Sequence, residues 1–204
     1  MRAPVKLFLA SSNPGKLAEF RVLASGVTAS SSPVDLELLP DFGSFPAFEE
    51  TAPTFSENAL GKALYYSRLK PGLVFADDSG LVVPAISGAP GVYSARYAGP
   101  TATSVERNAK LLNEMRGMQG NERTAFFVCA IAVAESGRAK AIVTDRVDGE
   151  ILEQPRGAGG FGYDPVFYFP ESGKTFAELS ADEKNTFSHR GKAFRKVIGL
   201  AEGF

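Results

Sequence analysis

The 204-residue sequence contains a single cysteine, a single histidine and no tryptophan. Because one thiol cannot form an intramolecular disulfide, a disulfide scaffold is excluded, and Cys129, inside an apolar run, is predicted to fill the core. One histidine and one cysteine are also too few for a structural zinc site, which is built mainly from imidazole and thiolate ligands. Any metal that this protein uses is therefore expected to be a hard cation held by carboxylate oxygens.

The sequence also lacks an excess of charge of either sign. Its 22 Lys and Arg side chains oppose 23 Asp and Glu side chains, for a formal net charge of -1. Binding to nucleic acid or to a membrane surface usually needs a basic excess or stripe, so neither partner is expected. The first apolar run, residues 5–10, is too short for a secretory signal or a membrane span. We predict a cytoplasmic protein that binds any anion through a local cluster of groups.

The sequence does contain enough apolar side chains for one compact domain. Hydrophobic residues make up 44% of the chain, and 16 residues are Phe, so disorder is not expected. Short apolar runs alternate with segments of helical periodicity. Three helices are predicted to begin with a capping box, at residues 54–57, 103–106 and 180–183. Two further helices are expected at residues 14–24 and from about residue 188.

The predicted strands indicate a mixed sheet. The long apolar run at 123–134 and the run at 140–147 flank a turn and predict an antiparallel hairpin. Residues 30–46 form the most loop-like region, and no internal repeat or long linker divides the chain. The fold class is therefore α/β with a mixed sheet flanked by helices, and residues 1–204 are expected to form a single domain.

Two adjacent aspartates, Asp77 and Asp78, separate the apolar runs 73–76 and 81–83, which places them at the end of a strand. Burial of two carboxylates is unfavourable unless a cation or hydrogen-bond donors compensate. Mg²⁺ would compensate, and a carboxylate beside it could activate a water, as hydrolysis of a phosphoanhydride requires. The alternative is an Asp-Ser-Gly turn capped by its own side chains. Glu49 and Glu50 offer further oxygen ligands, unless they belong to an exposed acidic loop.

A candidate phosphate site lies between the first strand and the first helix. It consists of Ser11, Ser12, Asn13, Pro14, Gly15 and Lys16. Backbone N–H groups, hydroxyls and the lysine could converge there on phosphate oxygens at the positive end of the helix. It is not a Walker A loop, since Ala10 stands where the first glycine would be and Leu17 follows the lysine in place of Ser or Thr. The alternative is a capped turn with a solvated lysine.

The glycine-rich run at 157–162 matches the pattern G-x-G-x-x-G. It precedes a strand, whereas the dinucleotide fingerprint follows a strand and opens a helix, so we do not interpret it as such a fingerprint. A glycine-rich backbone can approach a flat ligand closely, and Phe161 or Tyr163 could stack on a base while Asp164 accepts a hydrogen bond. The alternative is a tight turn that buries two aromatic side chains.

The only histidine, His189, precedes Arg190 at the start of the last predicted helix. The sequence offers no pairing of this histidine with a serine or cysteine nucleophile, so a role in recognition is favoured over a role in catalysis. Imidazole and guanidinium groups can both donate to a carbonyl oxygen. The pair could therefore select a purine with a 6-oxo group over a purine with a 6-amino group.

Together these segments resemble the inosine triphosphate pyrophosphatase family, whose members hydrolyse ITP, dITP and XTP. The resemblance covers nearly the whole chain and rests on residues 11–16, 54–59, 76–80, 88–97, 159–165 and 188–191, in the order of the family. It implies a two-lobed α/β fold around a long, twisted mixed sheet with the nucleotide in a central cleft. It also implies Mg²⁺ as the cofactor and a homodimer as the assembly.

The resemblance further implies roles for individual residues. Asp78 would accept a proton and contact Mg²⁺, Ser79 would touch the substrate, and Lys62 would assist residues 11–16 in binding the triphosphate. The base pocket would consist of Phe161, Gly162, Tyr163, Asp164, Lys184, His189 and Arg190. The second acidic metal contact would be Glu49 or Glu50. That choice stays open because Ala52 stands where the family pattern has a glycine.

The predicted function is hydrolysis of non-standard purine nucleoside triphosphates to the monophosphate and pyrophosphate, which removes them from the nucleotide pool. One alternative is a Maf-like pyrophosphatase for modified pyrimidine triphosphates, against which the His189 and Arg190 pair argues. A second alternative is a nucleotide sensor without catalysis. The third is an α/β protein whose glycine-rich segments are only turns.

Overall fold

A computed structural model describes residues 4–25 and 34–204. The first residues of the predicted loop, 30–33, lie outside the described residues. In the described part, seven strands form one sheet in the order β2-β1-β3-β4-β5-β6-β7. They are β1 (Val5–Leu9), β2 (Val34–Leu38), β3 (Leu73–Val82), β4 (Thr124–Glu135), β5 (Arg138–Ile151), β6 (Phe167–Phe169) and β7 (Lys174–Thr175). β1 pairs in parallel with β2 and β3, and the other pairs are antiparallel. The predicted mixed sheet is confirmed.

The helices begin where the sequence predicts them. They are α1 (Pro14–Ser25), α2 (Phe55–Leu69), α3 (Ser104–Glu114), α4 (Ala181–Phe187) and α5 (His189–Leu200). Thr103 and Ser180 complete capping boxes, and the Thr54 side chain accepts a hydrogen bond from the backbone N–H of Glu57. Short 3-10 helices connect these elements: η1 (Phe42–Ser44), η2 (Pro84–Ile86), η3 (Gly91–Arg96), η4 (Gly120–Arg123), η5 (Phe176–Glu178) and η6 (Ala201–Gly203).

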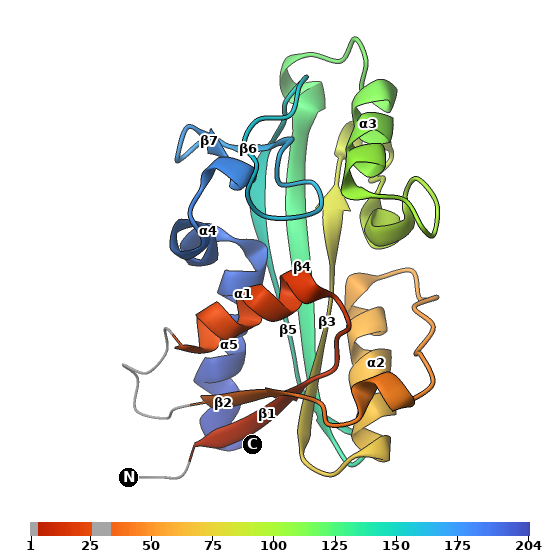
Figure 1. The fold of residues 1–204 in the computed structure, drawn as a ribbon, viewed down its shortest axis with the longest axis vertical. Helices are drawn as coiled ribbons and strands as arrows, with labels where there is room; N and C mark the ends of the chain where they lie inside the picture. The colour runs from red at the N-terminus through yellow and green to blue at the C-terminus, as the bar shows by residue number, and fades with distance from the viewer. Residues whose placement is uncertain (1–3, 26–33) are drawn as a thin grey trace.

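The long strands β3, β4 and β5 run along the length of the molecule (Figure 1). At one end of the molecule, α2 covers one face of the sheet and α1 and α5 cover the other, whereas α3, β6 and β7 lie towards the opposite end. The buried side chains follow this division. One cluster packs α3 against β6, a second packs the sheet against α1 and α5, and a third packs it against α2. The molecule therefore has two lobes that share the long strands.

The position of Asp77 and Asp78 differs from the prediction. β3 does not end at these residues but continues to Val82, and β4 pairs with it from Leu73↔Glu135 to Val82↔Phe126. The polar side chains do not interrupt the strand because they leave its backbone hydrogen bonds intact. Since side chains alternate along a strand, Asp77 and Ser79 lie on one face of the sheet and Asp78 lies on the other. The two carboxylates therefore have different neighbours.

The predicted loop at 30–46 is wrong over Val34–Leu38, which forms β2. This strand pairs with β1 from Val5↔Val34 to Leu9↔Leu38 at the edge of the sheet. Its two acidic residues and the prolines on either side of it make the segment look like a loop, and the pairing partner decides its conformation.

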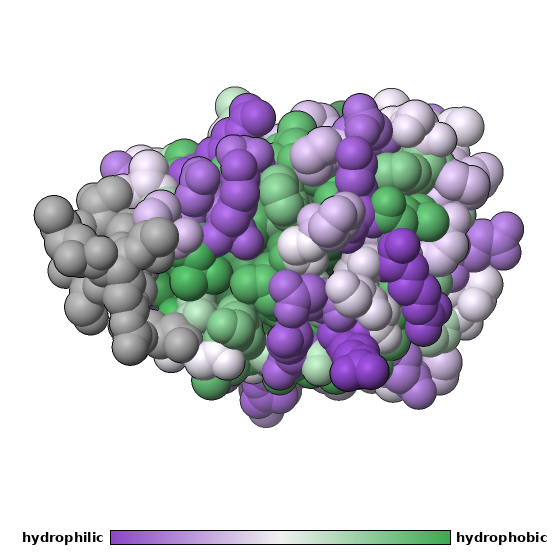
Figure 2. Space-filling view, turned by 90° about the horizontal axis from the view of Figure 1, so that it is seen from below, coloured by the Kyte–Doolittle hydropathy of each residue, from purple (hydrophilic) through white to green (hydrophobic). Residues whose placement is uncertain are grey.

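The surface at the end of the molecule that carries β1 and β2 is mixed in character. Figure 2 shows this end, which is the lower end of the molecule in Figure 1. Hydrophilic and hydrophobic side chains alternate across it. Within residues 4–25 and 34–204, none of the helices combines the length and the apolar character that crossing a bilayer requires.

Candidate functional site

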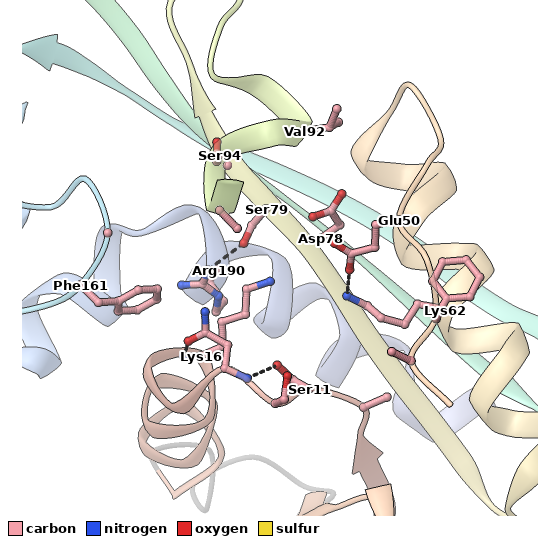
Figure 3. A pocket seen from close by; sticks show the side chains of 18 of the residues that line it. Ser11, Lys16, Glu50, Lys62, Asp78, Ser79, Val92, Ser94, Phe161 and Arg190 are labelled. Carbon is pink, nitrogen blue, oxygen red and sulfur yellow. Dashed lines mark hydrogen bonds and ion pairs between the residues drawn. The ribbon is translucent and has the colours of Figure 1, made fainter. Parts of the chain in front are cut away.

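A cavity of about 550 Å³ lies between the two lobes. It is lined by the turn between β1 and α1, the loop at 42–50, α2, the middle of β3, η3, the loop at 161–163 and the start of α5. Most of the site residues predicted from the sequence line it: Ser11, Ser12, Asn13, Lys16, Glu50, Lys62, Asp78, Ser79, Phe161, Gly162, Tyr163, His189 and Arg190. Figure 3 shows that Phe161 lies on one side of Lys16 and Arg190, and that Asp78, Glu50 and Lys62 lie on the other.

The turn before α1 is shaped by the Asn13 side chain. Its Oδ1 atom accepts hydrogen bonds from the N–H groups of Gly15 at 2.9 Å and Lys16 at 3.2 Å. The hydroxyl of Ser11 accepts from the N–H of Asn13. The backbone donors that the sequence suggested for phosphate are thus engaged within the turn. The residues of this turn that line the cavity are Ser11, Ser12, Asn13 and Lys16.

Asp78 lies on the face of the sheet that packs against α2. The Asn58 side chain donates to Asp78 Oδ2 at 3.0 Å. The same amide binds the backbone of Ala52 twice, accepting from its N–H at 2.9 Å and donating to its carbonyl at 3.2 Å. Asn58 is 1% exposed and therefore fixes the Asp78 carboxylate relative to the loop that carries Glu50.

The charge state of Asp78 reflects a crowded acidic environment. Burial, together with the nearby negative charge of Glu50, raises the pKa of Asp78 to about 6. Lys62 forms an ion pair with Glu50 and partly offsets this repulsion. A carboxylate with a raised pKa inside a cleft is typical of a group that takes part in proton transfer or cation binding.

The donors around Asp78 fit Mg²⁺. Asp78 and Glu50 both line the cavity, and a divalent cation would relieve the repulsion between them. Mg²⁺ usually takes one or two protein carboxylates and fills its remaining positions with water and phosphate oxygens. In the part of the chain that the structure describes, no three His, Cys, Asp or Glu side chains are grouped to enclose a metal. Glu49, by contrast, is exposed and lies outside the cavity lining.

Asp77 lies on the opposite face of the sheet and is completely buried. Its Oδ2 atom lies 2.9 Å from Lys16 Nζ and accepts a hydrogen bond from the Ser79 hydroxyl at 3.2 Å. Arg190 Nε is 3.7 Å from the same oxygen. Although burial raises the pKa of Asp77, the positive charges of Lys16 and Arg190 outweigh it and lower the pKa to about 2. Asp77 is therefore an anion whenever the protein is folded near neutral pH.

Asp164 and Lys184 lie behind the cavity lining and support Phe161. The Asp164 carboxylate accepts a hydrogen bond from the N–H of Phe161 at 2.8 Å and forms an ion pair with Lys184. The Lys184 amine lies 4.9 Å from the centre of the Phe161 ring. On the other side, a Cβ atom at Gly15 would lie only 2.7 Å from that ring. Asp164 and Lys184 thus support the ring, and the absence of a side chain at Gly15 leaves room for it. Pro14 and Gly15 lie outside the cavity lining.

His189 and Arg190 are nearly buried at the start of α5. The imidazole stacks on Phe127 with ring centres 4.8 Å apart. Burial and the positive charge of Arg190 lower the pKa of His189 well below its usual value, so the imidazole is neutral. The Arg190 guanidinium donates to the Ser79 hydroxyl at 2.8 Å and forms an ion pair with Glu19.

The sequence analysis did not single out several residues of this site, among them Arg107, which lines the cavity, and two residues that support the lining. Glu19 pairs with both Arg190 and Lys184, the latter at 2.6 Å. Asn58 holds Asp78. A weak signal existed for each of these two: Glu19 lies one helical turn after Lys16, on the same face of α1, and Asn58 follows the capping-box sequence at 54–57, of which the structure shows only the bond from the Glu57 N–H to the Thr54 side chain.

The two glycines of α5 provide a test of how tightly the base end is packed. A Cβ atom at Gly191 would lie 2.0 Å from the backbone oxygen of Asn185, whereas one at Gly199 would meet nothing within 4 Å. Gly191→Ala is expected to lower the free energy of unfolding by about 3 kcal/mol. The matched variant Gly199→Ala should raise it by about 0.5–1 kcal/mol, because alanine favours the helix. Urea titration of both variants checks this, and equal effects would contradict the packing described.

Comparisons with known proteins agree on one family. The model of the Ham1 family matches residues 7–200. A dITP/XTP pyrophosphatase from Geobacillus kaustophilus is 50% identical over 192 residues, which cover 94% of this chain and 92% of that protein. A dITP/XTP pyrophosphatase from Thermus thermophilus is 50% identical over 197 residues, covering 95% and 90%.

Solved structures show the same similarity in three dimensions. A HAM1 protein from Coxiella burnetii superimposes with a TM-score of 0.84 at 39% identity, covering 98% of this chain and 100% of that one. The Ham1 protein of Staphylococcus aureus superimposes with a TM-score of 0.83 at 36% identity, covering 97% and 98%. The similarity thus extends over both lobes and includes every segment that lines the cavity.

Proposed function

This chain belongs to the Ham1 family, and from that premise we propose that it hydrolyses non-standard purine nucleoside triphosphates, among them dITP, XTP and ITP, to the monophosphate and pyrophosphate. The observation that carries the proposal is the division of one cavity. Phe161 and Arg190 lie towards one end, and Lys62, Glu50 and Asp78 lie at the other. His189, which precedes Arg190 in the chain, also lines the cavity. The aromatic end could accommodate a flat purine base. The end with Lys62 and the two carboxylates could bind a triphosphate together with a cation.

Asp78 is proposed to accept the proton of the attacking water. As the water oxygen bonds to the α-phosphorus, the bond from that phosphorus to the bridging oxygen breaks and pyrophosphate leaves. Lys16 and Lys62 bind phosphate oxygens, and Asn58 holds the Asp78 carboxylate in one orientation. Glu50 and Asp78 would hold Mg²⁺, which supplies positive charge against the triphosphate. Charge stabilisation and positioning then account for most of the reduction in the barrier.

Base selection is proposed to depend on His189 and Arg190. A neutral imidazole has one N–H donor, and the guanidinium has several, so both can donate to a 6-oxo group. A 6-amino group would leave these buried donors unpaired, at a cost of about 1–3 kcal/mol each. The names of the relatives, dITP/XTP pyrophosphatases, also favour purine substrates over the pyrimidine substrates of a Maf-like enzyme.

A substrate profile tests the proposed activity. Purified protein with Mg²⁺ is assayed against dITP, XTP, ITP, ATP and GTP, and the phosphate products are separated. Turnover of dITP and XTP with pyrophosphate as the first product is expected. Orthophosphate as the only primary product, or equal turnover of ATP and ITP, would contradict the proposal. Nucleotide binding without turnover at any Mg²⁺ concentration would identify a sensor instead.

The metal contact is tested by two neighbouring glutamates. Glu50→Gln removes one of the two proposed carboxylate ligands and should raise the Mg²⁺ concentration for half-maximal activity about tenfold or more. Glu49→Gln is the matched control, because Glu49 is exposed outside the cavity lining, and it should leave the Mg²⁺ dependence unchanged. If Glu49→Gln raised the Mg²⁺ concentration for half-maximal activity and Glu50→Gln did not, the metal contact would have to be assigned to Glu49.

The assembly and the location of the protein stay predictions. A homodimer is expected from the family resemblance, and sedimentation velocity would show it as a species of twice the mass of the 21.7 kDa chain. A cytoplasmic location is expected from the composition, and cell fractionation would test it.

A further inference from the structure

Asp77 has a position that the proposed reaction does not explain. It is 0% exposed and lies on the face of β3 opposite to Asp78. One of its oxygens, Oδ2, interacts with two groups that are proposed to contact different parts of the substrate: Lys16 Nζ at 2.9 Å and Arg190 Nε at 3.7 Å. Lys16 is proposed to bind phosphate and Arg190 to contact the base, and the two side chains lie next to each other in Figure 3.

Two buried atoms at this point have no hydrogen-bond partner among the described residues. They are Asp77 Oδ1, an acceptor, and Arg190 Nε, a donor. Leaving such groups unpaired away from water is unfavourable, the more so when they are charged. Because Asp77 Oδ2 already lies 3.7 Å from Arg190 Nε, a small movement of the carboxylate towards the guanidinium would give this buried donor a hydrogen-bond partner. In the present arrangement the carboxylate interacts more strongly with Lys16 than with Arg190, because Lys16 is closer.

We propose that Asp77 is a positioning residue that couples phosphate binding to base recognition. When the phosphates of a substrate draw Lys16 away, the Asp77 carboxylate turns to Arg190 and fixes the guanidinium in the orientation that reads the base. This inference rests on the proposed function. Since coupling between two sites is reciprocal, a correct base also favours the release of Lys16 to the phosphates. Selectivity for the base should therefore be larger in triphosphates than in monophosphates.

Dissociation constants measured by calorimetry test this coupling without turnover. The probes are IMP and AMP, and the α,β-imido analogues of ITP and ATP. In these analogues a nitrogen replaces the oxygen between the α- and β-phosphorus atoms, so they resist the proposed cleavage. In the wild-type protein the preference for the hypoxanthine ligand should be at least about fivefold larger among the triphosphates than among the monophosphates. Asp77→Asn, which has the same shape without the charge, should make the two preferences equal.

Asp145→Asn is a matched control. Asp145 also lies in a strand and pairs with a lysine, Lys196, at 2.9 Å, but it is outside the cavity lining. It should leave both preferences unchanged. Asp77→Glu keeps the charge and should retain part of the difference. Thermal unfolding curves of the three variants would check that each of them is folded.

The outcomes separate the coupling from the activity. Equal preferences in the wild-type protein, or a preserved difference in Asp77→Asn, would overturn the coupling. If Asp77→Asn does not fold, the wild-type protein and Asp77→Glu decide. A difference of about fivefold in the wild type, part of which survives in Asp77→Glu, supports the coupling, and equal preferences in either protein overturn it. Failure of the wild-type protein to release pyrophosphate from dITP and XTP would instead overturn the proposed function.

Discussion

Asp78→Asn is expected to lower kcat for dITP and XTP by at least about a thousandfold, because it removes both a proton acceptor and a metal-binding charge. The fold should persist. The new side chain has the same shape, and its carbonyl oxygen can still accept the hydrogen bond from Asn58 that Asp78 Oδ2 accepts now. Loss of one of two mutually repelling carboxylates, Asp78 and Glu50, should leave the unfolding temperature of the metal-free protein unchanged or raise it.

The activity of this variant is measured by pyrophosphate release, with Asp145→Asn as a control for the removal of a carboxylate elsewhere in the sheet. Retained turnover in Asp78→Asn would show that another carboxylate activates the water. The candidates would then be Glu50, which lines the same end of the cavity, and Asp77.

Replacement of both His189 and Arg190 by alanine is expected to reduce the preference for ITP over ATP by roughly two to four orders of magnitude. The reason is the loss of two buried donors, each of which discriminates by about 1–3 kcal/mol. Arg190→Ala also leaves Glu19 without one of its two partners, so some loss of stability is expected. The ratio of kcat/KM for the two nucleotides, measured on one sample, does not depend on the fraction of folded protein.

Lys62→Gln provides the comparison at the other end of the cavity. Lys62 pairs with Glu50 and is proposed to bind phosphate, which ITP and ATP share. Its replacement should slow the hydrolysis of both ITP and ATP and leave the ratio of their kcat/KM values unchanged. An unchanged ratio in the His189 and Arg190 double variant would refute their assignment to the base.

Local signals in the sequence were enough to predict the helices. Thr103 and Ser180 form their capping boxes with residues three positions away, so the pattern and the structure depend on the same short segment. β2 was missed because an edge strand depends on its partner: Val34–Leu38 pairs with β1, almost 30 residues earlier in the chain. For the same reason the sequence did not show that β3 continues through Asp77 and Asp78, since β4 completes its hydrogen bonds.

The site shows the same limit. The sequence predicted Asp78, Lys16 and Arg190 as site residues from their residue types and from the family resemblance, but it did not predict which residues hold them in place. The ion pair between Glu19 and Arg190 joins positions 171 residues apart, and a local sequence pattern cannot predict such a contact. The choice between Glu49 and Glu50 was open for a related reason: adjacent residues in a loop point in different directions, and only the fold places Glu50 in the cavity.

Attack of water on the α-phosphorus is the central claim of the account, and isotope labelling tests it most directly. The protein is allowed to hydrolyse dITP in water enriched in ¹⁸O, and both products are examined by mass spectrometry. The account predicts one ¹⁸O atom in the nucleoside monophosphate and none in the pyrophosphate. Label in the pyrophosphate, or in orthophosphate released first, would contradict it.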